Sequence, residues 1–326
     1  MGCSNNSVNE KTSEKSFSKY INFYTIEKYE PNLKKDYGTV SFLELESDIF
    51  LVSTQNNKII LYDLKTYKAI LAIPLQETAN IIIKTQNNKI LFGDDIGKIF
   101  ILEINLQNTN KYNIINAYSC KSSITKIIEY KEDKFIVSSY KEILFLNFGK
   151  DNKLILKQKL KYHLAKTDIY NIYLVDNLLL SFSYEQKRGD KNEIIIYDLD
   201  DNNKIVHKEE KASVIPWCNT VCKFNSELLA ITGNRCEICI FEIKTFKVLE
   251  QIMDIDFFYC VFCIGKKIFC GGDSGKLYEF EYNYEYSDLK MINEFQIHDS
   301  SIFSINRISS GAIVTTSRDG TIKFFR

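Results

Sequence analysis

The chain ends in Arg318-Asp319-Gly320-Thr321-Ile322-Lys323-Phe324-Phe325-Arg326, where a tight turn precedes a short string of alternating apolar residues. Just before this turn, the string Ile313–Thr316 has the same apolar character. Because glycine readily adopts the positive φ that hairpin turns require, the two strings are predicted to pair as a β-hairpin.

The same hairpin recurs along the chain and gives seven units. The string after the turn reads KIILYDL from Lys58, KIFILEI from Lys98, EILFLNF from Glu142, EIIIYDL from Glu193, EICIFEI from Glu237, KLYEFEY from Lys276 and TIKFFR from Thr321. Equivalent positions lie 39 to 51 residues apart, and the units contain further strings before and after the hairpin. This period predicts seven sheets of four short strands each.

Composition excludes several classes of protein. The 326 residues are 45% hydrophobic and 13% aromatic, which predicts a large core rather than a disordered chain. Basic and acidic residues balance at 42 each, so we expect no nucleic acid as the partner, because that task needs a basic excess. The apolar strings are also too short for a transmembrane helix.

These repeats resemble the WD-repeat β-propeller family, and the resemblance covers residues 20–326. It implies an all-β, seven-bladed propeller of four-stranded antiparallel blades. The last unit has three strands of its own, and 20–26 (YINFYTI) alternates like a strand. The family implies that this N-terminal strand completes the last blade, which closes the ring and removes an exposed edge.

The last unit carries the clearest family motif. The resemblance implies that His298, Thr315 and Asp319 form a buried hydrogen-bonded set that braces the blade, with Phe325 at the position where tryptophan is usual. Phenylalanine has no indole N–H, so the set is expected to be partial. Most other units lack the histidine and the turn aspartate.

The family also implies which residues contact partners on the top face, namely those just before the inner strand of each blade. These positions are approximately Tyr37, Thr78, Ser123, Asp168, Trp217, Asp256 and Ser301. Trp217 is the only tryptophan and follows Pro216. Tryptophan is enriched in interface hot spots, although packing between blades is an equal alternative. We select Trp217, Tyr37, Asp168, Asp256 and Ser301 as partner-binding candidates.

Catalytic signals are weak. Three histidines are present, and we interpret His163, His207 and His298 as structural or solvent-exposed. No phosphate loop or nucleophile elbow is found. We therefore expect no enzyme, no cofactor and no metal ion, and a scaffold that binds other proteins. The alternative is a hydrolase or lactonase-like propeller with a metal or carboxylate site in its channel.

The nine cysteines are scattered and odd in number, which favours free thiols in a reducing compartment. Cys236-x-x-Cys239 and Cys260-x-x-Cys263 have the outline of a zinc ribbon. However, both pairs stand in strand-like strings, where residues three apart face opposite sides. Small core side chains are the favoured interpretation.

Residues 1–19 are predicted to form a flexible polar tail. Its start, Met1-Gly2-Cys3-Ser4, resembles that of N-myristoylated proteins with a palmitoylatable cysteine, although position 6 is Asn6. Gly2 and Cys3 are thus candidate lipidation sites, and an unmodified tail is the alternative. We expect the protein in the cytoplasm, with membrane association depending on acylation.

Overall fold

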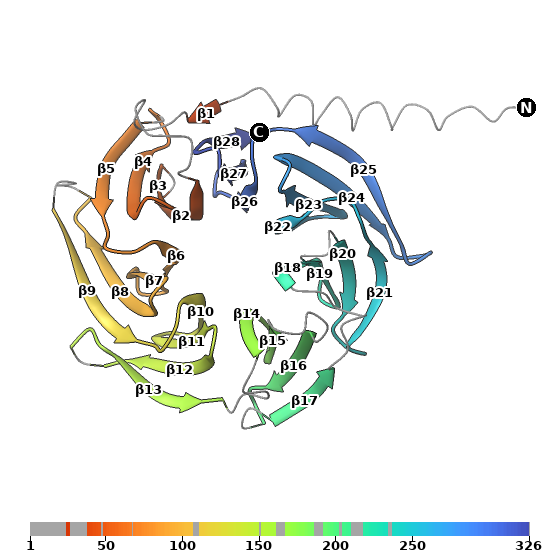
Figure 1. The fold of residues 1–326 in the computed structure, drawn as a ribbon, viewed down its shortest axis with the longest axis horizontal. Coiled ribbons are helices and arrows are strands. Elements are labelled where there is room, and N and C mark those ends of the chain that lie inside the picture. Colours follow the sequence, from red (N-terminus) through yellow and green to blue (C-terminus); the bar gives the residue numbers. More distant parts are fainter. Residues whose placement is uncertain are drawn as a thin grey trace, which may run out of the picture.

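A computed structural model describes residues 24–26, 38–46, 48–66, 68–106, 111–149, 151–160, 167–185, 192–201, 204–209, 218–233 and 237–325. These residues form seven four-stranded antiparallel sheets arranged as the blades of a ring (Figure 1). The predicted seven-bladed propeller is confirmed. No helix in the described part of the chain is long and apolar enough to cross a membrane.

The first four blades follow one another along the chain, each running from an innermost to an outermost strand (Figure 1). Blade 1 contains β2 (Thr39–Glu46), β3 (Ile49–Thr54), β4 (Lys58–Asp63) and β5 (Lys68–Pro74). Blade 2 contains β6 (Ala79–Lys84), β7 (Ile90–Asp94), β8 (Lys98–Ile104) and β9 (Tyr112–Ser119). Blade 3 contains β10 (Ile124–Lys131), β11 (Lys134–Ser139), β12 (Glu142–Phe148) and β13 (Leu154–Lys159). Blade 4 contains β14 (Thr167–Val175), β15 (Leu178–Glu185), β16 (Asn192–Asp198) and β17 (Lys204–Glu209).

The last three blades complete the ring. Blade 5 contains β18 (Cys218–Lys223), β19 (Leu228–Gly233), β20 (Glu237–Glu242) and β21 (Lys247–Ile252). Blade 6 contains β22 (Phe258–Ile264), β23 (Lys267–Gly272), β24 (Lys276–Asn283) and β25 (Asp288–Gln296). Blade 7 contains β26 (Ile302–Arg307), β27 (Ile313–Ser317) and β28 (Ile322–Phe325), and its outermost strand is β1 (Tyr24–Ile26).

The two ends of the chain meet in blade 7. Strand β1 pairs antiparallel with β28, with Tyr24 opposite Phe324 and Ile26 opposite Ile322. This pairing confirms that an N-terminal strand completes the last blade. It matters for stability because a sheet ending in β28 would present unpaired backbone groups at an exposed edge.

The turns between the second and third strands have the backbone conformation that their glycines predict. Gly97, Gly275 and Gly320 have positive φ angles of 92°, 79° and 80°, as their hairpins require. At Gly275 the space is closed as well, because an added Cβ would lie 2.2 Å from the carbonyl oxygen of His298. This turn therefore lies directly against the segment that leads into blade 7.

The core lies between blades. One cluster joins Ile238 and Ile240 of blade 5 to Phe258 and Phe280 of blade 6. Near the channel, side-chain amides also connect neighbouring inner strands. Asn219 Nδ2 donates to the carbonyl oxygen of Phe258 at 2.6 Å, and Asn171 Nδ2 donates to that of Asn219 at 2.8 Å. Apolar packing and these amide bonds both hold blade to blade.

Candidate functional site

The top face of the ring is defined here as the end carrying the connections between blades and the turns between second and third strands. Its described turns are 55–57, 95–97, 140–141, 273–275 and 318–320. Its described connections between blades include 75–78, 120–123, 253–257 and 297–301. Of the partner-binding candidates, Asp168, Asp256 and Ser301 are described, and they fall on this face.

In blade 7, three of the four predicted structural residues lie within hydrogen-bonding distance of one another. The His298 ring is buried, with Nε2 2.8 Å from Thr315 Oγ1 and Nδ1 3.0 Å from Asp319 Oδ2. Thr321, which the sequence analysis did not select, belongs to the same set, with its Oγ1 2.9 Å from His298 Nδ1. Phe325 is buried instead in the neighbouring apolar cluster with Ile302.

Protonation in this network follows from burial and hydrogen bonding. Burial lowers the pKa of His298 below its ordinary value of 6.5, although Asp319 opposes this shift. The ring is therefore neutral at pH 7, with Nδ1–H donating to Asp319 and Nε2 accepting from the Thr315 hydroxyl. Burial by itself would raise the pKa of Asp319, but hydrogen bonds from His298 and Thr321 outweigh it and hold that pKa below its ordinary value.

Blades 3, 4 and 5 place a glutamate at the position that Thr321 occupies in blade 7. Glu142 and Glu237 begin the third strands β12 and β20, Glu193 is the second residue of β16, and all three are at most 5% exposed. Each contacts a polar side chain of the outermost strand of its own blade. The contacts are Lys159 Nζ to Glu142 Oε2 at 2.5 Å, Lys208 Nζ to Glu193 Oε1 at 3.0 Å, and Gln251 Nε2 to Glu237 Oε2 at 2.7 Å.

Two of the partner-binding candidates have a different environment from the one expected. Asp168 is 5% exposed and forms an ion pair with Lys141 in the turn of blade 3. Ser301 is 2% exposed and donates to Asp273 Oδ1 in the turn of blade 6 at 2.6 Å. Both side chains face the preceding blade because the start of each inner strand lies beside that blade's turn. Their role in binding a partner stays a prediction.

Of the other three partner-binding candidates, Asp256 is among the described residues. Asp256 is half-buried and accepts from Ser274 Oγ at 2.5 Å and from the Tyr278 hydroxyl at 3.1 Å, both within blade 6. Tyr37 and Trp217 lie outside the described residues, as do Gly2 and Cys3.

Aromatic side chains gather on the top face, around the starts of inner strands, in two clusters, which we call the mouth clusters. In the first, the Tyr170 ring lies 5.6 Å from that of Tyr140 and 5.3 Å from that of Tyr184. In the second, the Tyr259 ring lies 4.7 Å from that of Phe257 and 5.1 Å from that of Phe303. Five of these six rings retain partial exposure, and Tyr184 is buried beneath them.

Sequence reasoning missed the mouth clusters, yet a signal was present. Tyr170, Tyr259 and Phe303 each follow directly after the first buried apolar residue of an inner strand. Because side chains alternate in direction along a strand, the residue after a core-facing one faces away from that core contact. An aromatic residue at that step in several units therefore marks a cluster at the channel.

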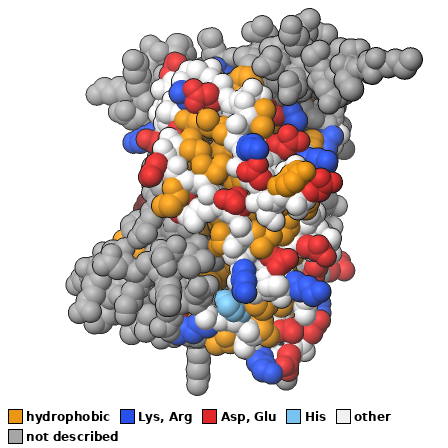
Figure 2. All heavy atoms as spheres, turned by 90° about the vertical axis from the view of Figure 1, so that its right-hand side faces the viewer, with side chains coloured by type: hydrophobic (Ala, Val, Ile, Leu, Met, Phe, Trp, Pro, Cys, Tyr) orange, Lys and Arg blue, Asp and Glu red, His pale blue; other side chains and the backbone are white. Residues whose placement is uncertain are grey.

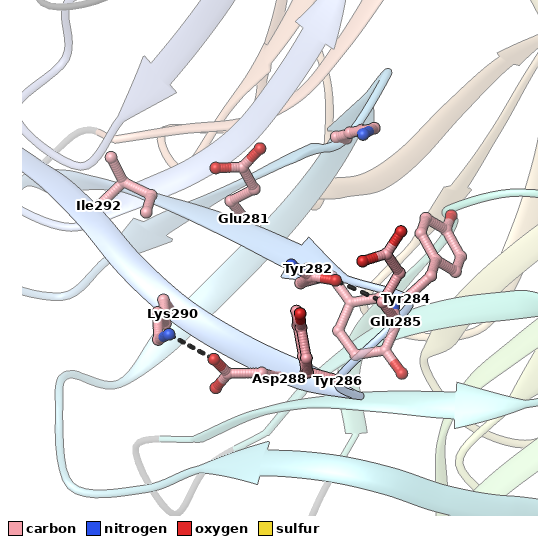
Figure 3. A pocket seen from close by; sticks show the side chains of 10 residues that line it. Glu281, Tyr282, Tyr284, Glu285, Tyr286, Asp288, Lys290 and Ile292 are labelled. Carbon is pink, nitrogen blue, oxygen red and sulfur yellow. Dashed lines mark hydrogen bonds and ion pairs between the residues drawn. The ribbon is translucent and has the colours of Figure 1, made fainter. Parts of the chain in front are cut away.

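A hollow lies on the outer wall of blade 6, at a different place from the mouth clusters. The β24–β25 hairpin lines a recess of about 670 Å³ in which Tyr286 is 76% exposed (Figure 3). Asp288 and Lys290 form an ion pair at 2.5 Å beside it. Tyr284 is held against blade 5, where its ring stacks on Phe224 at 5.8 Å.

The wall around this recess is mixed in character. Figure 2 looks at that side of the ring and shows apolar side chains interspersed with lysines and acidic residues. Met291 and Ile292 of β25 and Leu249 of β21 are among the exposed apolar residues.

Metal-ligating residues do not converge within the described ranges. No group of three or more His, Cys, Asp or Glu side chains there is arranged to hold an ion. Cys260 and Cys263 pack against different apolar clusters, Cys260 toward blade 7 and Cys263 toward blade 5. Cys239 is buried in a third cluster, and Cys236 and His163 lie outside the described residues. His207 packs against Phe246 with ring centroids 5.0 Å apart.

Comparison with solved structures shows the fold. The WD40 β-propeller domain of Doa1 matches with a TM-score of 0.67 and 16% identity, covering 90% of this chain and 94% of that chain. U3-55K matches with a TM-score of 0.68 and 9% identity, covering 90% and 96%. BamB from Moraxella catarrhalis matches with a TM-score of 0.62 and 13% identity, covering 88% and 84%. No protein-family model and no curated protein matches the sequence.

Proposed function

We propose that this chain is a degenerate WD-repeat propeller that acts as a non-catalytic scaffold, binding other proteins on its top face. The observation that carries the proposal is the pair of mouth clusters. Partly exposed aromatic rings on a rigid frame offer a partner a large apolar area at low entropic cost, and tyrosine adds a hydroxyl that can hydrogen-bond. Trp217 is proposed to extend this surface, because it precedes the inner strand of blade 5.

The fold supports this role through rigidity. The inner strands that carry Tyr170 and Tyr259 are linked through β18 by amide hydrogen bonds. Apolar clusters join blade 5 to blade 6 and blade 6 to the inner strand of blade 7, which carries Phe303. A preorganised surface binds without first having to be ordered, so less of the interaction free energy is lost. Tyr259 is further oriented by its hydroxyl, which donates to Asp273 Oδ1 at 3.2 Å.

The test compares variants of the two surfaces in affinity purification with quantitative mass spectrometry. Tyr140→Ala and Trp217→Ala alter the proposed surface, and Tyr286→Ala, which removes a 76% exposed tyrosine from the outer wall, is the matched control. We expect the first two to reduce the same set of partners at least tenfold, while Tyr286→Ala retains them. Melting curves establish that all three variants are folded. Partners that survive both top-face changes would overturn the proposal.

We further propose that the protein is cytoplasmic and that acylation at Gly2 and Cys3 brings it to membranes. A myristoyl chain alone binds a membrane only marginally, so stable attachment needs the second lipid on Cys3. Metabolic labelling with an alkyne myristate, comparing the natural chain with Gly2→Ala, tests the first lipid. Label that does not depend on Gly2, or no label at all, would contradict this proposal.

A further inference from the structure

A recess of about 500 Å³ lies between blades 3 and 4, and we call it the interblade recess. Blade 3 lines it with residues from each of its strands, β10 to β13. Blade 4 lines it with the turns 176–177 and 199–200, which lie at the end of the ring opposite the top face. A ligand held here would therefore not touch the surface proposed above, and its size suits a small binding pocket.

The apolar part of the lining is firmly packed. The ring of Tyr130 lies 5.7 Å from that of Phe145 at an interplanar angle of 82°, an edge-to-face contact. Leu174 and Leu199 of blade 4 are half-buried and pack against the apolar cluster that contains Phe145. The backbone N–H of Leu199 donates to the carbonyl oxygen of Asn177 at 2.9 Å, which joins the two turns of blade 4. The interblade recess is thus preformed, and filling it requires little ordering.

The wall from blade 3 carries positive charge. Lys131, Lys134 and Lys157 are exposed and line the recess. Within the described part of the chain, none of these three ammonium groups has an ion pair or a hydrogen bond with another side chain. In contrast, Lys159, two residues further along β13, is paired with Glu142. A concave surface with charges of one sign attracts a ligand of the opposite sign, so this wall favours an anionic group.

The wall from blade 4 carries the opposite charge. Asp176 and Asp200 are exposed and line this side. Asp176 Oδ1 lies 3.3 Å from Lys223 Nζ of blade 5, so part of its charge is already compensated. The interblade recess is therefore positive on one wall and negative on the other, with apolar side chains between them.

We propose that the interblade recess binds an acidic peptide segment of a partner protein. Its acidic residues face the three lysines, an apolar side chain packs against Tyr130 and Leu199, and a basic residue at one end faces the two aspartates. Charge complementarity supports a peptide over a dense polyanion, because the aspartate wall would repel a nucleoside triphosphate or an anionic membrane. A peptide can place opposite charges on the two walls.

The first experiment measures the binding of short synthetic peptides to the full chain by fluorescence polarisation. The peptides have a central phenylalanine or serine, and their flanks are acidic and basic, acidic on both sides, neutral, or basic on both sides. We expect the affinity to fall in that order, and phenylalanine to bind about threefold more tightly than serine. Tightest binding of the basic peptides, or no acidic peptide bound more tightly than the neutral ones, would overturn the proposal.

Charge reversal tests the three lysines. The triple variant Lys131→Glu, Lys134→Glu and Lys157→Glu should weaken binding of the acidic peptides by about tenfold or more, and should bind the basic peptides instead. The matched control changes the net charge equally at three exposed lysines outside the recess, as Lys68→Glu, Lys111→Glu and Lys244→Glu. The control should retain the parent's affinity. Equal weakening in both triple variants would show that net charge, and not the recess, attracts the peptide.

Competition distinguishes the peptide from other anions. Vesicles containing phosphatidylserine and adenosine triphosphate should each fail to displace the acidic peptide at physiological salt, and displacement that depends on the three lysines would overturn the assignment to a peptide. Melting curves establish that each variant is folded. Tyr140→Ala on the top face should bind these peptides as the parent does, so a failure here is distinct from a failure of the proposed scaffold surface. Loss of peptide binding in Tyr140→Ala would contradict the location of the site.

Discussion

Blade 7 and blades 3 to 5 hold their top edges together by different chemistry at equivalent positions. Blade 7 uses a neutral imidazole, a carboxylate and two hydroxyls, centred on His298 and Asp319. Blades 3 to 5 use buried glutamates that contact the outermost strand, as Glu193 contacts Lys208. The first arrangement joins the blade entrance to the turn and the middle strands, and the second joins the third strand to the fourth.

This difference explains how a propeller forms when most of its units lack the family motif. At the top end of a blade the turn is partly buried, and the polar groups there need hydrogen-bond partners. A histidine network meets that requirement in blade 7, whereas in blade 4 the carboxylate oxygens of Glu193 are buried without a hydrogen bond and Lys208 contributes an ion pair instead. The sheet geometry is common to all blades, so the bracing side chains are free to vary.

The largest expected effect comes from the closure that only blade 7 has. Its fourth strand is β1, from the opposite end of the chain, whereas blades 3 to 5 supply all four strands locally. Deleting 20–26 should lower the melting temperature by roughly 10 °C or more, because the deletion exposes the edge of β28 to solvent. Differential scanning calorimetry measures the change, and deletion of 1–19 is the control. Unchanged melting after loss of 20–26 would show that this pairing does not stabilise the ring.

The second-largest expected effect is the loss of stability when the hydrogen-bond network of blade 7 is broken, compared with a change at an exposed residue beside it. Asp319→Ala removes the acceptor of His298 and of the Asp299 and Thr321 N–H groups, which should lower the free energy of unfolding by about 3 kcal/mol. Asp299→Ala changes an exposed neighbour and should cost less than about 0.5 kcal/mol. Urea titration distinguishes the two, and equal losses would mean that the network braces nothing.

Breaking the glutamate arrangement tests the other side of the comparison. Lys208→Ala leaves Glu193 buried without its ion pair, so we expect a loss of about 2 kcal/mol, reduced from fully buried cases because Lys208 is partly exposed. Replacing both residues, as Glu193→Leu with Lys208→Met, should recover most of that loss because no charge remains buried. A double variant less stable than Lys208→Ala would show that the pair itself is required.

The smallest effect is a pH dependence that blade 7 alone contributes through its histidine. The unfolded chain protonates His298 near 6.5, whereas burial lowers the pKa of the folded side chain. As pH falls below 6.5, the unfolded state binds a proton that the native state does not, so stability decreases until the folded pKa is passed. His298→Gln should flatten this part of the stability profile, measured by urea midpoints between pH 8 and pH 5. An unchanged slope would place the titration elsewhere.

Several features could be predicted from local sequence because they repeat or depend on nearby residues. The recurring hairpins determined seven sheets, and Gly97, Gly275 and Gly320 determined the turns between them. The sequence also grouped His298, Thr315 and Asp319 correctly in space, since all three lie within one unit. Thr321 was not selected from the sequence, because a threonine directly before a strand carries no distinctive signal.

Other features depended on contacts between blades. The resemblance selected Asp168 and Ser301 by their place before an inner strand, but it could not show that each side chain reaches the turn of the preceding blade. The strand pattern specifies which residues start an inner strand, and it contains no information on the distance to a neighbour in another sheet.

Periodicity alone thus determined the architecture of this protein, because alternation along a strand and positive φ at a turn are properties of a few consecutive residues. Only the tertiary structure decided which aromatic side chains of the mouth clusters remain exposed and which carboxylates are buried. Those properties arise where separate sheets pack against one another, at separations in sequence of 40 residues or so, the length of one repeat.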